Sequence, residues 1–255
     1  MLLALEIGNS NVVVAFFNGD QLRASGRMQA DASNTVDDWW TALRHLAEGA
    51  GMDLSAVSQV ALASVVPDIG TALANMVARH MGQEALRVHA NLPLELGLDV
   101  KDPDSVGADR ICNVVGCREL YGAPAVVVDL GTATTFDVID AQGHFIGGSI
   151  APGVESSARQ LFKAAALLSA VELKVPDTVI GRDTETNLQA GIVFGAVDQI
   201  DGMLVRIAAE TGWDDMQVVI TGGLSHLVAP QLRTTAIHDP DLTVQGLRLI
   251  AERCV

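Results

Sequence analysis

Basic residues are scarce in this chain. Its 255 residues include 16 lysines and arginines against 31 aspartates and glutamates, which gives a formal net charge of −15 at pH 7. A surface of that sign repels the phosphates of DNA, RNA and anionic lipid, so we expect neither a nucleic acid nor a membrane as a partner. A small anionic ligand stays possible where backbone N–H groups, a few cations such as Arg110 and metal ions neutralise it locally.

Cysteine is also rare, and long apolar runs are missing. The three cysteines, Cys112, Cys117 and Cys254, are odd in number and lack metal-ligand spacing, which indicates buried thiols in a reducing compartment. The six histidines include no pair at helical ligand spacing, so a structural zinc site is not expected. Too few residues precede Glu6 for a signal peptide, and no apolar run is long enough to cross a bilayer. The sequence therefore predicts a cytoplasmic protein.

Three common signatures of nucleotide and hydrolase sites are absent as well. The chain contains no Gly-x-x-x-x-Gly-Lys-Ser/Thr phosphate loop, no Gly-x-Gly-x-x-Gly fingerprint and no Gly-x-Ser-x-Gly nucleophile elbow. Hydrophobic residues, by contrast, make up 49% of the chain, which is ample material for a core. If this protein binds ATP, a different kind of turn must hold the phosphates.

The chain does contain one short pattern in two copies. Glu-Ile-Gly-Asn-Ser-Asn at residues 6–11 and Asp-Leu-Gly-Thr-Ala-Thr at residues 129–134 each follow an apolar run. Each copy combines an acid, a spacer, a glycine and small polar residues. A second apolar stretch then leads to a turn signal, at residues 18–20 or 140–143, so each copy is typical of a β-hairpin.

Each hairpin has the chemistry of a phosphate site. Its glycine lets the backbone approach a ligand, its hydroxyl and N–H groups can donate to phosphate oxygens, and its acid can hold a cation. The alternative is that an acid-x-Gly turn only connects two strands, and for a single copy that would be the better explanation. Two copies in a chain of this size favour a duplicated phosphate site.

A third motif, Gly-Ala-Asp-Arg at residues 107–110, stands at the start of an expected helix. The helix dipole favours an ionised Asp109 there, and its carboxylate could accept a proton from a substrate hydroxyl. Arg110 can bind a carboxylate or a phosphate through two parallel hydrogen bonds. An N-terminal helix cap with an ordinary ion-pairing arginine explains the same residues.

The order of the expected elements predicts an α/β chain of two similar domains. Besides the two hairpins, strands are expected near residues 60–66, 86–89, 125–128 and 217–221, with a strand or a turn at 147–153. Helices are expected near 36–51, 69–82, 109–121, 154–170 and 186–211, and at the end of the chain after residue 223. The stretch after the first hairpin is more polar. Because each half begins with a hairpin and then alternates strands with helices, we expect domains at residues 1–122 and 123–255, facing one another across a cleft.

Taken together and in order, these pieces resemble the type III pantothenate kinase family, within the acetate and sugar kinase, Hsp70 and actin superfamily. The resemblance covers nearly the whole chain. Beside residues 6–11, 106–110 and 128–137, it includes Ser-Val-Val-Pro at 64–67, Gly-Gly-Ser-Ile-Ala-Pro-Gly at 147–153, Ile-Gly-Arg-Asp-Thr at 180–184 and Thr-Gly-Gly at 221–223. It implies two ribonuclease-H-like domains of the actin-like ATPase fold. The implied reaction transfers the γ-phosphoryl group of ATP to the primary hydroxyl of pantothenate, the first step of coenzyme A biosynthesis.

The resemblance also implies cofactors, partners and site residues. ATP would be the co-substrate, Mg²⁺ and a monovalent cation (K⁺ or ammonium) the cofactors, and the protein a homodimer. The nucleotide phosphates would be bound by Glu6, Ile7, Gly8, Asn9, Ser10, Asn11, Val12, Val13 and Thr132. Asp129 would hold the monovalent cation, and Glu6 is the candidate ligand for Mg²⁺. Pantothenate would be bound by Val100, Gly107, Ala108, Asp109, Arg110 and Thr184, with Asp109 as proton acceptor and Arg110 near the substrate carboxylate.

Two residues depart from the pattern of the family. Glu6 stands where many members have Asp, so its carboxylate reaches one methylene further towards a cation. Val100 occupies the place of a substrate-contacting Tyr; it can pack against the dimethyl group of pantothenate but cannot donate a hydrogen bond.

Two other functions are compatible with the resemblance. A non-catalytic relative that serves as a transcription accessory factor would be expected to have lost Asp109 or Asp129, and both are present. The chain could also be a different small-molecule acid kinase, or a phosphatase acting on polyphosphate, from the same superfamily. The Gly-Ala-Asp-Arg segment and the short length favour the pantothenate kinase.

Overall fold

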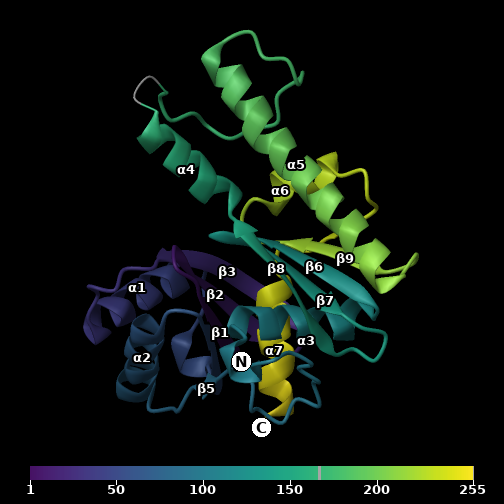
Figure 1. Cartoon of the computed structure of the whole chain (residues 1–255). Coiled ribbons are helices and arrows are strands. Elements are labelled where there is room, and N and C mark those ends of the chain that lie inside the picture. The colour runs from purple at the N-terminus through teal and green to yellow at the C-terminus, as the bar shows by residue number, and fades with distance from the viewer. Residues whose placement is uncertain (166–167, 255) are drawn as a thin grey trace. The chain divides into compact units, whose positions relative to one another are not determined.

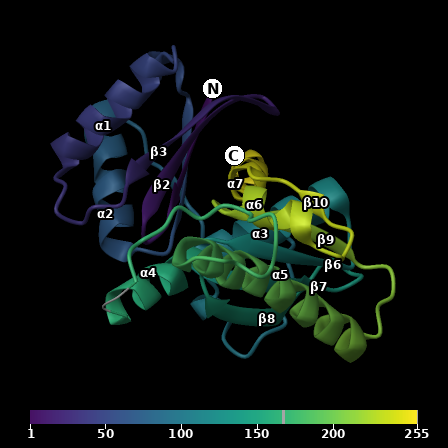
Figure 2. The ribbon, with the colours of Figure 1, turned by 90° about the horizontal axis from the view of Figure 1, so that it is seen from above.

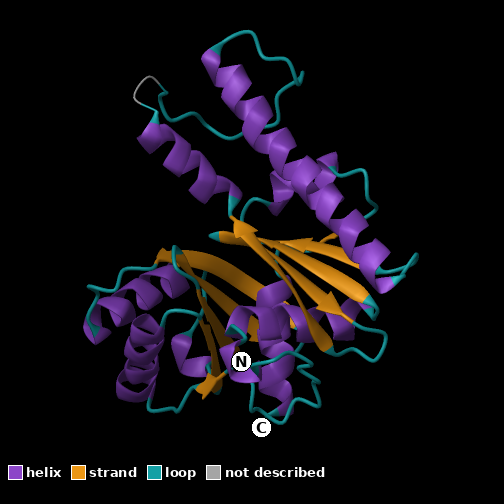
Figure 3. Cartoon of the chain, viewed as in Figure 1, coloured by secondary structure: helices purple, strands orange, loops and turns teal. Residues whose placement is uncertain are grey.

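The computed structural model describes residues 1–165 and 168–254, and the chain divides into two compact units. The first unit comprises Met1–Glu119 together with the chain from Leu242 onward, and the second comprises Leu120–Asp241. Each unit contains one five-stranded sheet of mixed direction, flanked by helices (Figures 1 and 3). The predicted α/β class is therefore confirmed. None of the helices in the described residues is long and apolar enough to cross a membrane.

In the first unit the strands lie in the order β3-β2-β1-β4-β5. The central strand β1 runs antiparallel to β2 and parallel to β4. The elements are β1 (Leu2–Ile7), β2 (Asn11–Asn18), β3 (Gln21–Gln29), α1 (Val36–Gly49), β4 (Gln59–Ser64), α2 (Pro67–Met76) with a π-helical extension (Val77–Met81), β5 (Leu86–Arg87), α3 (Ala108–Tyr121) and α7 (Leu242–Arg253).

The second unit repeats this topology. Its strands lie in the order β8-β7-β6-β9-β10, and the central strand β6 runs antiparallel to β7 and parallel to β9. The elements are β6 (Ala125–Leu130), β7 (Ala133–Ile139), β8 (Phe145–Pro152), α4 (Val154–Ala164), α5 (Thr184–Thr211), β9 (Gln217–Thr221), α6 (Ser225–Val228) and β10 (Ile237–His238). The repeat that was inferred from two short motifs is thus a repeat of the whole sheet.

The first sheet is covered by helices on both faces, which explains why β1 is apolar from Leu2 to Leu5, ahead of Glu6. On one face, Leu43 of α1 and Leu73 of α2 pack against Leu3 and Leu5 of β1. Figure 2 shows α1 and α2 next to one another on this side of the sheet. The other face is covered by α3 and α7, through a cluster made of Leu2, Ala4, Ala61, Ile111, Val115, Leu247 and Ile250, among others. Arg248 of α7 is a buried charged residue on this second face, where its guanidinium lies over the Phe17 ring.

Helix α5 covers one face of the second sheet. Val197, Ile200 and Leu204 pack against a cluster that includes Val128 of β6 and Phe136 of β7. The bounds of this helix follow from its end residues. Asp183 caps the N-terminus by accepting a hydrogen bond from the Thr186 N–H, and Gly212, at φ +72°, ends the helix in the left-handed conformation.

Three elements differ from the sequence-based expectation. The polar stretch after the first hairpin is the edge strand β3, whose residues are mostly exposed or half-buried and therefore lack an apolar face. Helix α4 ends at Ala164 rather than at residue 170, and residues 166 and 167 of the expected helix lie outside the described residues. The last helix, α7, belongs to the first unit rather than to the second half of the chain, because its apolar stripe is buried against β1 and β4.

The crossing of α3 and α7 generates a prediction on stability. A Cβ atom on Gly246 of α7 would overlap the carbonyl of Cys112 in α3. Gly246→Ala should therefore lower the free energy of unfolding by about 1–3 kcal/mol, as overpacking in a core does. Gly202→Ala is the matched control, because Gly202 is an exposed position of α5 where a Cβ would meet nothing within 4 Å. It should raise the free energy of unfolding by about 0.5–1 kcal/mol. Denaturant titrations measure both, and effects of the same sign would contradict the close crossing.

Candidate active site

The first acid-x-Gly motif forms the turn between β1 and β2. Glu6 is the second-last residue of β1 and pairs with Val13 of β2 on one side and Ala63 of β4 on the other. The Gly8 N–H closes the turn by donating to the Asn11 carbonyl at 2.9 Å. A Cβ on Gly8 would lie 3.5 Å from Glu6 Oε1, so the carboxylate lies over the turn backbone. The acid and the turn N–H groups are therefore neighbours, as the motif predicts.

The second motif forms the equivalent turn between β6 and β7. Asp129 is the second-last residue of β6 and pairs with Thr135 of β7 and Thr221 of β9, just as Glu6 pairs in its own sheet. The Gly131 N–H donates to the Ala133 carbonyl at 3.0 Å. The two acids thus occupy the same position in two copies of one fold.

Gly222 is a site residue whose role the sequence did not reveal. It follows β9, and a Cβ there would lie 2.5 Å from both Asp129 Oδ1 and the Leu130 nitrogen. Its carbonyl accepts a hydrogen bond from Ser225 Oγ at 2.6 Å. Only glycine leaves room for the Asp129 carboxylate at this place. The signal in the sequence was the Thr-Gly-Gly segment at residues 221–223, but its contact with Asp129 depends on the pairing of β6 with β9.

The Gly-Ala-Asp-Arg motif lies at the N-terminus of α3, as expected. Asp109 is half-buried, and its Oδ1 accepts a hydrogen bond from the Arg110 N–H at 2.7 Å. A Cβ on Gly107 would lie 2.5 Å from the same oxygen and 3.4 Å from Cγ1 of Val65. The carboxylate therefore folds back over Gly107, beside the bend that follows β4. A side chain at position 107 would displace it.

Asp109 and Glu6 of the first turn both act on the same buried thiol, that of Cys112. Burial raises the pKa of the Cys112 thiol, and the negative charges of Asp109 and Glu6 raise that pKa further. Both carboxylates therefore act on one buried group, which places the Glu6 turn and the start of α3 in the same part of the first unit. Burial also raises the pKa of Asp109 itself, against the opposing effects of the Arg110 N–H and guanidinium. A carboxyl with a raised pKa is a stronger base than an ordinary aspartate.

The remaining predicted residues lie on other elements. Val100 is half-buried in the irregular segment that precedes α3. Thr184 is the exposed first residue of α5, in the second unit. Thr132 is exposed at the tip of the second turn. Their contacts with a substrate or nucleotide stay predictions.

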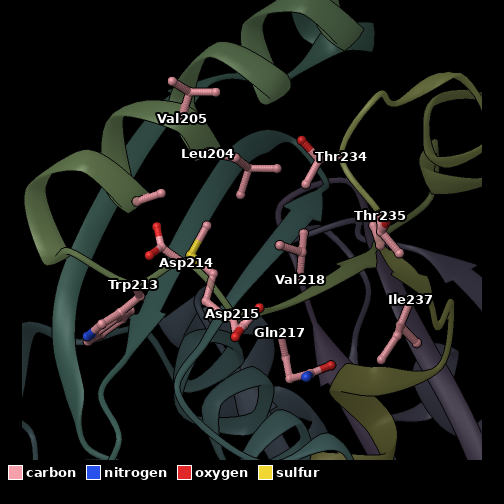
Figure 4. Close-up of a pocket in the computed structure, with 13 residues that line it drawn as sticks. Leu204, Val205, Trp213, Asp214, Asp215, Gln217, Val218, Thr234, Thr235 and Ile237 are labelled. Carbon is pink, nitrogen blue, oxygen red and sulfur yellow. The ribbon is translucent and has the colours of Figure 1, made fainter.

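The second unit also contains a cavity of about 540 Å³, which lies away from the predicted site residues (Figure 4). Leu204 and Val205 of α5, Trp213 after it, and Gln217 at the start of β9 are among its lining residues. No residue of the predicted site lines it. It lies at the amino end of β9, whereas Asp129 pairs with Thr221 at the carboxyl end. Because ligands of open α/β sheets bind beyond the carboxyl ends of the strands, the turns are the better candidate for the chemistry.

The raised pKa of Asp109 leads to a prediction on stability against pH. The folded state holds this proton more tightly than the unfolded state, so stability falls as pH rises from about 4, the pKa of an unfolded carboxyl, through the folded pKa. Asp109→Asn cannot lose that proton. We expect this variant to be at least as stable as the wild type at pH 7, with the difference vanishing below about pH 4. Unfolding titrations at several pH values measure it.

Asp201 is the control for this prediction, because its pKa is shifted in the opposite direction. Burial alone would raise its pKa, but hydrogen bonds from the N–H groups of Arg233 and Thr234 and from the Thr234 hydroxyl outweigh burial and lower it. Its stabilisation is present at neutral pH and is lost as pH falls through the folded pKa. Asp201→Asn should therefore be less stable than the wild type at pH 7. A loss of stability of the same size in both variants would contradict the assignment for Asp109.

Comparison with known proteins identifies the family. Residues 2–206 match the family model of the type III pantothenate kinases. The protein of that name from Moorella thermoacetica is 42% identical to this chain, over 99% of each sequence. A relative of the same name from Thermomicrobium roseum is also 42% identical, over 99% of this chain and 97% of its own. Curated relatives therefore favour a kinase and do not favour the regulatory alternative.

Solved structures support the fold. A Campylobacter jejuni structure described within the Baf family of transcriptional activators has a TM-score of 0.61 at 20% identity and covers 98% of both chains. A Sinorhizobium meliloti structure described as a 2-dehydro-3-deoxygalactonokinase has a TM-score of 0.62 at 13% identity, over 99% and 96% of the chains. At such identities these likenesses concern the fold alone, and they agree with the two-domain fold of the sugar kinase and actin-like ATPase superfamily. With two equivalent acid-bearing turns, a matching family model and full-length relatives of one name, the chain belongs to the type III pantothenate kinase family.

Proposed function

We propose that this chain transfers the γ-phosphoryl group of ATP to the primary hydroxyl of pantothenate, with Asp109 as the proton acceptor. Family membership supports the reaction, and the position of Asp109 supports the role. Its carboxylate lies at a helix N-terminus, accepts a hydrogen bond from the Arg110 N–H on Oδ1, and has a pKa raised by burial. Cys112, Cys117 and Cys254 form no disulfide among the described residues, which agrees with a cytoplasmic site of action.

The two turns would align the nucleotide. Phosphoryl transfer needs mainly positioning and charge neutralisation, so the protein has to supply donors and cations rather than a covalent nucleophile. In the first turn, N–H groups and the Ser10 hydroxyl would donate to phosphate oxygens, within the loop of residues 6–13. In the second turn, Thr132 would do the same.

Glu6 and Asp129 would hold the cations. Carboxylate and carbonyl oxygens are the ligands that Mg²⁺ and similar hard cations prefer, and both turns combine an acid with backbone carbonyls. Gly222 leaves space beside Asp129 Oδ1 that no side chain could share, because a Cβ there would lie 2.5 Å from this oxygen. We assign the monovalent cation to Asp129 and Mg²⁺ to Glu6. Bound there, the cations would neutralise the charge of the phosphates.

The pantothenate site would be built at the start of α3. Gly107 and Ala108 would leave room for the substrate beside Asp109, and the Arg110 guanidinium would bind the substrate carboxylate. Val100 would pack against the dimethyl group, and Thr184 of the second unit would bind the same substrate. The cleft expected between the units also stays a prediction.

The decisive measurement is ADP release by the purified protein with Mg-ATP, in the presence and absence of pantothenate. We expect turnover that depends on pantothenate, and Asp109→Asn should lower kcat by about 10²–10⁴-fold, the usual contribution of a positioned general base. Asp68→Asn is the matched control. Asp68 is the second residue of α2 as Asp109 is of α3, but it is exposed.

Three outcomes of this experiment separate the parts of the proposal. Undiminished kcat in Asp109→Asn would refute the proton-acceptor role. Equal turnover in potassium and sodium buffer would refute the assignment of a monovalent cation to Asp129. If pantothenate stimulated nothing in either buffer while the wild type remained folded, the reaction itself would be wrong for this chain.

We also propose that the protein is a homodimer formed through the second unit. Strand β8 is an edge of its sheet, and its Ile150 side chain is 66% exposed. Val179 and Ile180, before α5, are 70% and 78% exposed. The outer edge of a sheet and exposed apolar side chains both favour association with another chain.

Sedimentation analysis tests the dimer. The wild type should sediment at about twice its chain mass of 26.8 kDa, and Ile150→Glu should shift it towards the monomer, because a charge would be buried at the contact. Val205→Glu is the control, since Val205 of α5 is also 66% exposed but lies on a different element. A monomeric wild type, or equal dissociation by both variants, would contradict a contact through β8.

A further inference from the structure

The two phosphate turns share a feature that their motifs do not contain. In the first unit, the carbonyl of Ser10 in the β1–β2 turn accepts a hydrogen bond from the Ala30 N–H at 3.1 Å. Ala30 is the residue that directly follows the third strand, β3. In the second unit, the carbonyl of Thr132 in the β6–β7 turn accepts a hydrogen bond from Ser156 Oγ at 2.9 Å. Ser156 lies in the first turn of α4, just after the third strand, β8. In both copies, the segment after the third strand holds the carbonyl at the tip of the turn.

A glycine brings that segment against the second turn. Gly153, the N-cap of α4, is buried, and a Cβ there would overlap the Thr132 carbonyl and lie 2.5 Å from the Gly131 carbonyl. The turn therefore rests directly on the start of α4, and Ser156, one helical turn further, reaches the same carbonyl. Ser157 is its neighbour in the helix, but the Ser157 side chain is exposed and only its backbone N–H has a partner here, the Gly153 carbonyl.

Holding one carbonyl fixes the orientation of the whole turn. The peptide bond is planar and trans, so the Thr132 carbonyl and the Ala133 N–H point in opposite directions. A hydrogen bond that holds the carbonyl towards α4 therefore stops the peptide from rotating and directs the other face of the turn away from the helix. The backbone from which the Thr132 hydroxyl extends is held with it.

We propose that Ser156 is a positioning residue for the nucleotide, which holds the Gly131–Thr132 turn in the orientation that binds the phosphates. This inference rests on the proposed function, since it takes Thr132 as a phosphate contact. In the first unit a backbone N–H does the same task, whereas in the second unit the donor is a side chain that can be exchanged. Ser156 itself needs no contact with ATP.

The test compares four forms of the full chain: the wild type, Ser156→Ala, Ser156→Thr and the control Ser157→Ala. Calorimetry with a non-hydrolysable ATP analogue and Mg²⁺ measures nucleotide binding without turnover, and ADP release gives KM for each substrate. Ser156→Ala should weaken analogue binding and raise KM for ATP by about 3–10-fold, which corresponds to the loss of one hydrogen bond. KM for pantothenate should not change. Ser156→Thr, which keeps the hydroxyl, and Ser157→Ala should behave like the wild type.

Each result bears on the inference. If Ser156→Ala bound the analogue as tightly as the wild type, if both alanine variants weakened it equally, or if Ser156→Thr failed to restore binding, the positioning role would be overturned. A wild type that binds the analogue but does not phosphorylate pantothenate would refute the proposed reaction alone. The binding constants of the four forms would still test the positioning role of Ser156. A wild type that does not bind the analogue would overturn both.

Discussion

In each unit, one central strand pairs antiparallel on one side and parallel on the other, and the candidate site depends on that pairing. The antiparallel partner follows after a tight turn, so the last residues of β1 and β6 are carried directly into a hairpin. The parallel partner ends at the same edge, which brings Ser64 beside Ile7 and Thr221 beside Asp129. An acid placed one residue before the end of the strand is thereby surrounded by chain turns on two sides. The same order and direction of strands in two sheets explains why two short motifs have equivalent surroundings.

Glycine makes these close approaches possible. At Gly107, Gly153 and Gly222 a single methyl group would collide with an acid or with a turn of the predicted site. Gly107 and Gly153 do not have a positive φ, so at these two positions the absence of a side chain is what matters, whereas Gly222, at φ +93°, also needs the backbone freedom of glycine. Gly107 leaves room for the Asp109 carboxylate in a partly buried position, and this burial raises the pKa of Asp109. The same burial that destabilises the ionised carboxylate makes it a better proton acceptor.

Much of this arrangement could be predicted from the sequence, and the limits have physical causes. The hairpins and α3 were predictable because strand alternation, turn residues and helix starts are local signals. Strand β3 was not predicted because an edge strand buries little apolar surface, so its sequence lacks the apolar pattern by which a strand is recognised. The placement of α7 could not be inferred, since an amphipathic helix does not encode which sheet it will cover. Likewise, the contacts of Ser156 with Thr132 and of Gly222 with Asp129 join residues that only the folded sheet brings together.

The assignment of α7 to the first unit has a consequence for biosynthesis. Residues 120–241 form a contiguous unit, which is complete before the end of the chain leaves the ribosome. The first unit is discontinuous: its strands are made first, but one of the two helices on their second face is made last. Until α7 arrives, Ala4, Ala61 and Ile111 lack part of their covering, and Gln59 lacks the carbonyl of Ala251 that its side chain binds at 2.9 Å. The half of the protein that is synthesised first is therefore the half that is finished last, and a chain that stops short of residue 242 would expose an apolar layer to aggregation.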